Sequence, residues 1–241
     1  MDKAVAQRGT IGQGASAPAL TFAILAFGLT VLLAFIAGVL LPGAGVLAGP
    51  AVLVVVAGFG FRGMAAGYPH PRLGACNVVT LVRAALTAGL VAALFTPGAA
   101  AWGVVAVALV ALALDGVDGW LARRGGLVSD FGARFDMEVD ALLALVLALL
   151  ALAAGKVGPW VLVLGGLRYV YVAAGVVWPW LRGNLPPRAG RKTVCVIQMA
   201  TLIALIAPPV APPLSLWLAA GATALLVWSF AADIVWLWRR R

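Results

Sequence analysis

Charged side chains are scarce in this sequence. Only 10% of its 241 residues are Asp, Glu, Lys or Arg, against about 25% in typical soluble domains. Hydrophobic residues make up 64%, and the mean hydropathy is +1.08. One water-soluble core of this size cannot hide so much apolar surface. The composition therefore excludes an ordinary soluble domain, a disordered chain and a typical nucleic-acid binder, and it indicates a polytopic membrane protein.

Cysteine and histidine are scarce as well. The two cysteines, Cys76 and Cys195, are too few and too far apart for a disulfide framework or a zinc site, so we interpret both as small apolar residues. The single histidine, His70, lies between two prolines and is expected in a surface loop. The first apolar run, 20–41, is longer than the core of a signal peptide and has no clear cleavage site after it, so we expect it to remain in the protein.

Long apolar runs separated by Pro, Gly or Arg predict an all-α, polytopic membrane bundle. The predicted spans are 19–41, 44–61, 78–96, 99–122, 134–154, 158–181, 193–208 and 214–238. Short connections such as 42–43, 97–98 and 208–209 contain proline, and they leave no room for a soluble domain.

The basic residues predict the orientation of these spans. The net charge is +9, and all but two of the 17 Lys and Arg residues fall in the N-terminal tail, in alternate connections with their adjoining helix ends, or at the C-terminus. The positive-inside rule then places both termini in the cytoplasm. The exceptions are Lys156, in an opposite loop, and Arg168, inside a span. We expect an integral protein of a bacterial-type inner or plasma membrane.

Six of the eight acidic residues lie within one short segment. They are Asp115, Asp118, Asp130, Asp136, Glu138 and Asp140. On helices, Asp115 and Asp118 share one face at i, i+3, and Asp136 and Asp140 share another at i, i+4. Carboxylates in membrane helices are costly unless they are paired, metal-bound or hydrated. Pairing with Arg123 or Arg134 is one possibility.

Metal binding is the alternative to simple pairing. The short connection 124–130 makes the two helices antiparallel neighbours, so the four carboxylates of Asp115, Asp118, Asp136 and Asp140 are predicted to converge. Oxygen ligands without His or Cys suit hard cations such as Mg²⁺ or Mn²⁺. Two such ions would hold a diphosphate and stabilise a phosphoryl-transfer transition state.

The same segment resembles the signature of the CDP-alcohol phosphatidyltransferase family. The signature reads D-x-x-D-G-x-x-A-R, a spacer of about eight residues, then G-x-x-x-D-x-x-x-D. Every fixed position is present, as Asp115, Asp118, Gly119, Ala122, Arg123, Gly132, Asp136 and Asp140. Upstream, Asn77, Thr80 and Arg83 are similar to the family's N-x-x-T-x-x-R stretch. The resemblance extends from about Asn77 to the C-terminus.

The resemblance implies a membrane core of six helices that usually dimerises and displaces CMP from a CDP-linked donor with an alcohol. It assigns two divalent ions, Mg²⁺ or Mn²⁺, to the four signature aspartates, and it makes Asp140 the candidate general base. The nucleotide pocket would be formed by Asn77, Thr80, Arg83, Gly119, Ala122, Arg123 and Gly132. By this division, 1–18 is a cytoplasmic tail, 19–61 an extra transmembrane hairpin and 62–241 the family's membrane domain. We interpret the hairpin as a packing element or an accessory lipid contact.

The remaining cations suggest an acceptor site. Arg168, Arg188, Arg191 and Lys192 together would bind the phosphate of an acceptor such as glycerol 3-phosphate. Lys192-Thr193 followed by Gln198 is similar to an element of phosphatidylglycerophosphate synthases. Other interpretations are an ion pair or snorkelling for Arg168, and topology alone for the loop cations.

The leading hypothesis is metal-dependent transfer of a phosphatidyl group from CDP-diacylglycerol to glycerol 3-phosphate, in a homodimer that binds membrane lipids and no nucleic acid. Inositol phosphate, phosphatidylglycerol, serine and choline are alternative acceptors. A UbiA-type prenyltransferase and a cation transporter are alternatives from other classes, because both place carboxylates in membrane helices.

Overall fold

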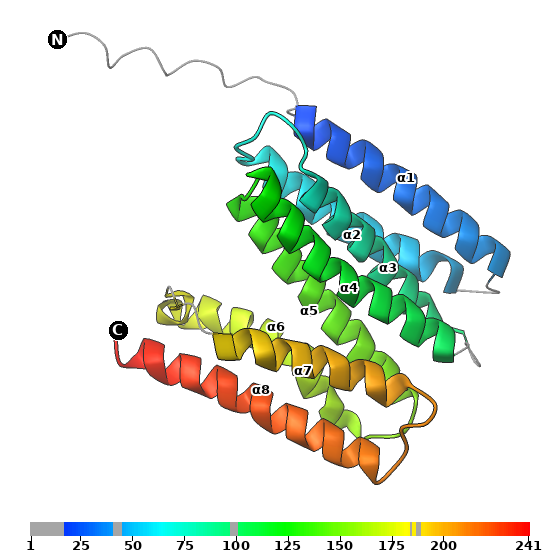
Figure 1. The fold of residues 1–241 in the computed structure, drawn as a ribbon, viewed down its shortest axis with the longest axis vertical. Helices are drawn as coiled ribbons and strands as arrows, with labels where there is room; N and C mark the ends of the chain where they lie inside the picture. Colours follow the sequence, from blue (N-terminus) through cyan, green and yellow to red (C-terminus); the bar gives the residue numbers. More distant parts are fainter. Residues whose placement is uncertain (1–16, 41–44, 97–100, 184, 187–188) are drawn as a thin grey trace.

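The computed structural model describes residues 17–40, 45–96, 101–183, 185–186 and 189–241, which form helices and no strand (Figure 1). The α-helices are α1 (Ala17–Leu40), α2 (Gly45–Ala65), α3 (Ala75–Ala93), α4 (Ala101–Gly125), α5 (Asp130–Ala153), α6 (Leu162–Val177), α7 (Ala189–Ile206) and α8 (Leu214–Trp238). Two short 3₁₀-helices, η1 (Pro159–Val161) and η2 (Pro179–Arg182), flank α6. The predicted all-α bundle is confirmed.

Among the described residues, six helices are long and apolar enough to cross a membrane: α1, α2, α3, α4, α6 with its leading turn, and α8. The protein is therefore an integral membrane protein. Of the other two, α5 carries four carboxylates in its N-terminal half, and α7 has 18 residues. The predicted span 158–181 is wrong at its end, because α6 stops at Val177, just before Pro179.

The N-terminal hairpin packs on α3 and on the first half of α5. Its apolar cluster includes Phe22 of α1, Leu53 of α2, Leu81 of α3 and Phe135 of α5. The rings of Phe22 and Phe135 meet edge to face, with centroids 5.5 Å apart. A Cβ on Gly60 would lie 2.6 Å from the Phe22 ring, so glycine is needed for this contact.

A second apolar cluster joins α4, the second half of α5 and helices α6 to α8. Gly165 lets α6 approach α5, since a Cβ there would lie 2.7 Å from the carbonyl oxygen of Ala144. Helix α5 contributes Phe135 and Val139 to the first cluster and Leu143 onward to the second. It therefore connects the two halves of the bundle.

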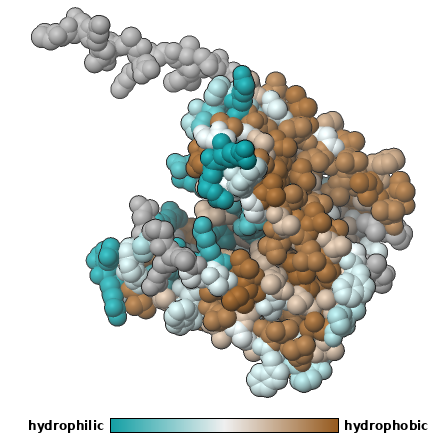
Figure 2. Space-filling view, viewed as in Figure 1, coloured by the Kyte–Doolittle hydropathy of each residue, from teal (hydrophilic) through white to brown (hydrophobic). Residues whose placement is uncertain are grey.

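The turn between α4 and α5 makes these helices antiparallel neighbours. Gly126 has a φ of 62°, a left-handed conformation that glycine adopts without strain. Ser129 then caps α5, because its side-chain oxygen accepts a hydrogen bond from the Gly132 amide at 3.0 Å. Hydrophilic side chains gather around a hollow on one side of the molecule (Figure 2), where α4 ends and α5 begins in Figure 1.

Candidate active site

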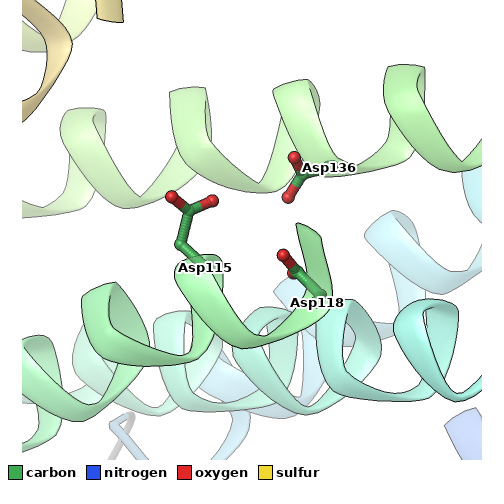
Figure 3. A group of neighbouring side chains, drawn as sticks. All are labelled: Asp115, Asp118 and Asp136. Carbon is green, nitrogen blue, oxygen red and sulfur yellow. The ribbon is translucent and has the colours of Figure 1, made fainter. Parts of the chain in front are cut away.

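The four signature carboxylates converge where α4 and α5 lie side by side. Asp115 and Asp118 come from α4, and Asp136 and Asp140 come from α5. Oxygens of Asp115, Asp118 and Asp136 all lie within 4.8 Å of one another, and the three side chains point toward a common centre (Figure 3). Asp118 is buried, whereas the side chains of the other three are between 35% and 40% exposed. The cluster is therefore closed on one side and accessible on the other.

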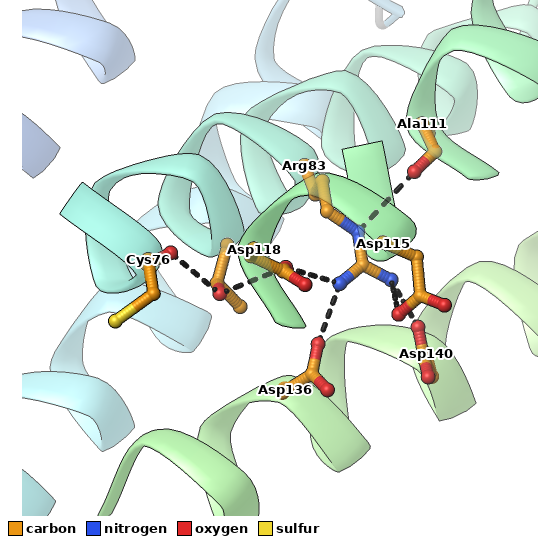
Figure 4. A network of polar contacts seen from close by, with 8 residues as sticks. Cys76, Arg83, Ala111, Asp115, Asp118, Asp136 and Asp140 are labelled. Carbon is orange, nitrogen blue, oxygen red and sulfur yellow. Dashed lines mark hydrogen bonds and ion pairs between the residues drawn. The ribbon is translucent and has the colours of Figure 1, made fainter. Parts of the chain in front are cut away.

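Arg83 of α3 lies among these carboxylates and forms ion pairs with all four (Figure 4). Its side chain is only 1% exposed. Nη1 is 2.7 Å from Asp118 and 2.5 Å from Asp136. Nη2 is 3.1 Å from Asp115 and contacts Asp140. Within the described part of the chain, the aspartates therefore form ion pairs with Arg83, and not with Arg123 or Arg134 as the sequence had left possible. The sequence analysis had placed Arg83 in the nucleotide pocket.

Side chains of α3 fix this network against α4. Nε of Arg83 donates a hydrogen bond to the carbonyl of Ala111 at 3.2 Å, which fixes the guanidinium against α4. The Thr80 hydroxyl lies 3.1 Å from a carboxylate oxygen of Asp118 and 3.0 Å from the carbonyl of Cys76. Thr80 and Arg83 therefore both orient Asp118, the most buried carboxylate of the cluster.

Asn77, one turn before Thr80, lies against the start of α5. A Cβ on Gly132 would be 3.1 Å from the Asn77 side-chain oxygen, so the signature glycine leaves room for the amide. The Asn77 amide nitrogen donates to the Tyr68 hydroxyl at 3.0 Å, and the Gly74 amide donates to the same oxygen at 3.3 Å. Burial raises the pKa of Tyr68, so its hydroxyl stays neutral. Sequence analysis did not single out Tyr68, because nothing in the local pattern links it to Asn77.

The remaining signature residues continue along α4 beyond Asp118. The guanidinium of Arg123 lies over Gly119, where a Cβ would be 3.3 Å from Nη1. Arg123 is exposed, and Ala122 is partly exposed beside it. This end of α4 therefore offers a cation and a surface with small side chains next to the carboxylates.

Three of the four predicted acceptor cations, Arg168, Arg191 and Lys192, lie in the described part of the chain, and Arg168 and Arg191 each form an ion pair with a carboxylate. Arg168 pairs with Glu138 at 2.6 Å, the ion pair that was one interpretation of this residue, and its Nε is buried with no hydrogen-bond partner among the described residues. Arg191 lies 3.4 Å from Asp233 of α8 and donates to the carbonyl of Pro186. Lys192 is exposed, and Arg188 lies outside the described residues. Sequence analysis missed the contribution of Asp233, which lies far along the chain from Arg191.

The donor set fits divalent cations. Four carboxylates face one guanidinium, so ionised aspartates leave the cluster with excess negative charge. All the charged ligands are hard oxygens, as Mg²⁺ and Mn²⁺ prefer. Asp115, Asp118 and Asp136 are close enough together to share one ion.

Comparison with protein families matches residues 74–228 to the CDP-alcohol phosphatidyltransferase model. The matched range covers most of the chain and contains the whole carboxylate cluster. The chain belongs to the CDP-alcohol phosphatidyltransferase family. Its members are membrane phosphotransferases of phospholipid biosynthesis that use a CDP-linked donor, an alcohol acceptor and a divalent metal. Helices α1 and α2 lie outside the matched range.

Comparison with curated proteins found no match, and comparison with solved structures found none either. Family membership favours phosphatidyl transfer over the prenyltransferase and transporter alternatives.

Proposed function

We propose that this phosphatidyltransferase transfers the phosphatidyl group of CDP-diacylglycerol to glycerol 3-phosphate and releases CMP. The observation that carries the proposal is the convergence of the four signature carboxylates in one cluster that is open on one side. Asp115, Asp118, Asp136 and Asp140 would hold two Mg²⁺ or Mn²⁺ ions. When bound, the ions supply charge neutralisation for the diphosphate and the leaving CMP.

Asp140 is the candidate general base. It lies one turn after Asp136 on α5, and its side chain is 39% exposed, so an acceptor hydroxyl can reach it. In the proposed step, this carboxylate takes the hydroxyl proton while the acceptor oxygen attacks the phosphorus that bears the diacylglycerol moiety. A new P–O bond forms, the bond to CMP breaks, and the proton remains on Asp140. Asp118, which is buried and held by Arg83 and Thr80, would keep the other carboxylates in position.

The nucleotide would lie between α3 and the end of α4. Asn77 and Thr80 line the α3 side, and Gly119, Ala122 and Gly132 present no bulky side chain there. Arg123 can form charge-assisted hydrogen bonds to phosphate oxygens. Arg83 contacts all four carboxylates, so it would affect nucleotide binding indirectly, by positioning the aspartates.

The acceptor phosphate is assigned to the cations on α6 and α7. Among the described residues, the buried Nε of Arg168 has no hydrogen-bond partner, and it could donate a hydrogen bond to a phosphate oxygen. Arg191 and Lys192 lie in the first turn of α7, and Arg188 precedes this helix in the sequence; all three would add positive charge. We further infer that the enzyme is a homodimer in a bacterial-type membrane, with both termini and the carboxylate cluster on the cytoplasmic side.

A product assay tests the proposal. The purified chain is incubated in nanodiscs with CDP-diacylglycerol, Mn²⁺ and, separately, glycerol 3-phosphate, inositol phosphate, phosphatidylglycerol, serine or choline. We expect CMP release and phosphatidylglycerophosphate by mass spectrometry with glycerol 3-phosphate, and loss of both on adding a chelator. A different lipid product would overturn the acceptor assignment, and CMP release that persists after chelation would overturn the metal role.

Replacing Arg168 with glutamine is expected to raise the KM for glycerol 3-phosphate roughly tenfold to a hundredfold, because a hydrogen bond to a charged group is lost. The kcat should change much less, since Arg168 does not touch the reacting atoms. Glu138→Gln is the matched control: it removes the Arg168–Glu138 ion pair and keeps the guanidinium. Equal KM increases in both variants would show that the ion pair supports the structure and that Arg168 does not bind the acceptor.

A further inference from the structure

A cavity lies on the far side of α5 from the carboxylate cluster. Its volume is about 710 Å³, and its walls come from α2, α5 and α6. On α5 it is lined by Arg134, Glu138 and Leu142, which recur every four residues. These positions are offset by two residues from Asp136 and Asp140, or about 200° around the helix. The cavity is therefore a separate groove, and α2, which lies outside the family match, supplies one wall.

The groove has the length and polarity of one membrane leaflet. Along α5 it runs from Asp130 to Leu142, a rise of about 18 Å, close to half of the ~30 Å hydrocarbon core. Asp130 and Arg134 lie at one end of the groove, in the first turns of α5, and the carboxylate cluster lies near the same end of this helix. Val55 and Leu142 line the deep end. The groove thus passes from a polar end to an apolar end, as a phospholipid passes from its headgroup to its acyl chains.

The groove opens toward lipid. Helix α2 is long and apolar enough to span a membrane, and two of its groove-lining side chains, Val55 and Phe59, are 58% and 72% exposed. Glu138 is already paired with Arg168. Arg134, by contrast, is exposed, and within the described part of the chain no carboxylate forms an ion pair with it. Its guanidinium is thus available to a phosphate at the polar end.

We propose that this groove binds one membrane phospholipid, with an acyl chain along Val55, Phe59 and Leu142 and its phosphate on Arg134. The site is distinct from the donor site, because it faces away from the carboxylates. The added hairpin thereby makes a lipid contact that the matched region of the family cannot make alone. The proposal does not depend on which acceptor the enzyme uses.

Photo-crosslinking tests the groove in the full chain. The protein is reconstituted in phosphatidylethanolamine vesicles that contain phosphatidylglycerol with a diazirine on its acyl chain, and labelled peptides are mapped by mass spectrometry. A parallel sample contains diazirine-diacylglycerol, which lacks the phosphate. We expect phosphatidylglycerol labelling at Phe59 and Leu142. Arg134→Gln should lower it about fivefold, the effect of one Arg near a membrane surface, and should leave diacylglycerol labelling unchanged. Arg62→Gln, on α2 outside the groove lining, is the control.

Filling the groove gives an independent measurement. Val55→Trp should block labelling at Phe59 and Leu142, whereas Val54→Trp, on the adjacent exposed position outside the lining, should not. Equal labelling in Val55→Trp and Val54→Trp would overturn the site, since it would reflect bulk lipid. Equal phosphatidylglycerol labelling with and without Arg134 would overturn phosphate recognition. Crosslinks from these residues to a second protein chain would show that another copy covers the groove.

Discussion

Asp140→Asn is expected to lower CMP release by about 10²–10⁴-fold, the range of a general base. The substitution keeps the size of the side chain and its contact with Arg83, and it removes the group that takes the acceptor proton. The assay is CMP release from CDP-diacylglycerol with saturating acceptor and Mn²⁺. Mn²⁺ binding by the variant, measured by calorimetry, should retain at least one ion, because Asp115, Asp118 and Asp136 form the compact set without Asp140.

The control for this prediction is Asp130→Asn. Asp130 is the first residue of α5, is exposed and lies outside the cluster, so near-normal CMP release is expected. A folded Asp140→Asn protein with near-normal activity would remove Asp140 from the catalytic step. An Asp118→Asn protein that still bound Mn²⁺ normally would contradict the assignment of the buried aspartate as a metal ligand.

Arg83→Met is expected to lower the free energy of unfolding by about 3 kcal/mol in the absence of divalent ions. This is the lower end of the range for breaking a buried ion pair, because three of the four carboxylates are more than a third exposed. Methionine keeps the apolar contacts of the stem but leaves the carboxylates to repel one another. In a chain of this length the melting temperature should fall by roughly 6–12 °C.

Mn²⁺ separates this electrostatic effect from a packing defect. It should raise the melting temperature of Arg83→Met more than that of the unmodified protein, because the guanidinium no longer competes for the carboxylates. Arg62→Met, at the exposed end of α2, is the control and should melt normally. If Mn²⁺ gave the two proteins equal stabilisation, Arg83 would not be the counter-ion of the cluster.

The helices could be predicted from the sequence because lipid selects for unbroken apolar runs. The predicted span 214–238 coincides with α8, and 19–41 differs from α1 by at most two residues at either end. Hydropathy alone misplaced the end of α6, because Trp178 and the residues after it are apolar enough to continue a span while Pro179 stops the helix.

The partners of the charged residues could not be predicted in the same way. The signature predicted that the four aspartates converge, since i, i+3 and i, i+4 spacings on adjacent antiparallel helices leave little choice. Which cation meets them depends on how α3 packs against α4 and α5, and a motif on one helix does not contain that information. The same holds for Arg168 with Glu138 and for Arg191 with Asp233, which pair different helices.

The contact between the hairpin and α3 has a consequence for how such an enzyme can vary. A Cβ on Gly49 would lie 2.8 Å from the carbonyl oxygen of Ala88, so the two helices meet through close backbone packing. The residues that α3 buries there, such as Leu81 and Ala84, are apolar, and lipid would solvate them as well as α2 does. A helical pair can therefore join or leave this side of the bundle without any change in the residues that carry the chemistry. We therefore expect accessory helices to vary among enzymes of one membrane family while the reaction centre stays the same.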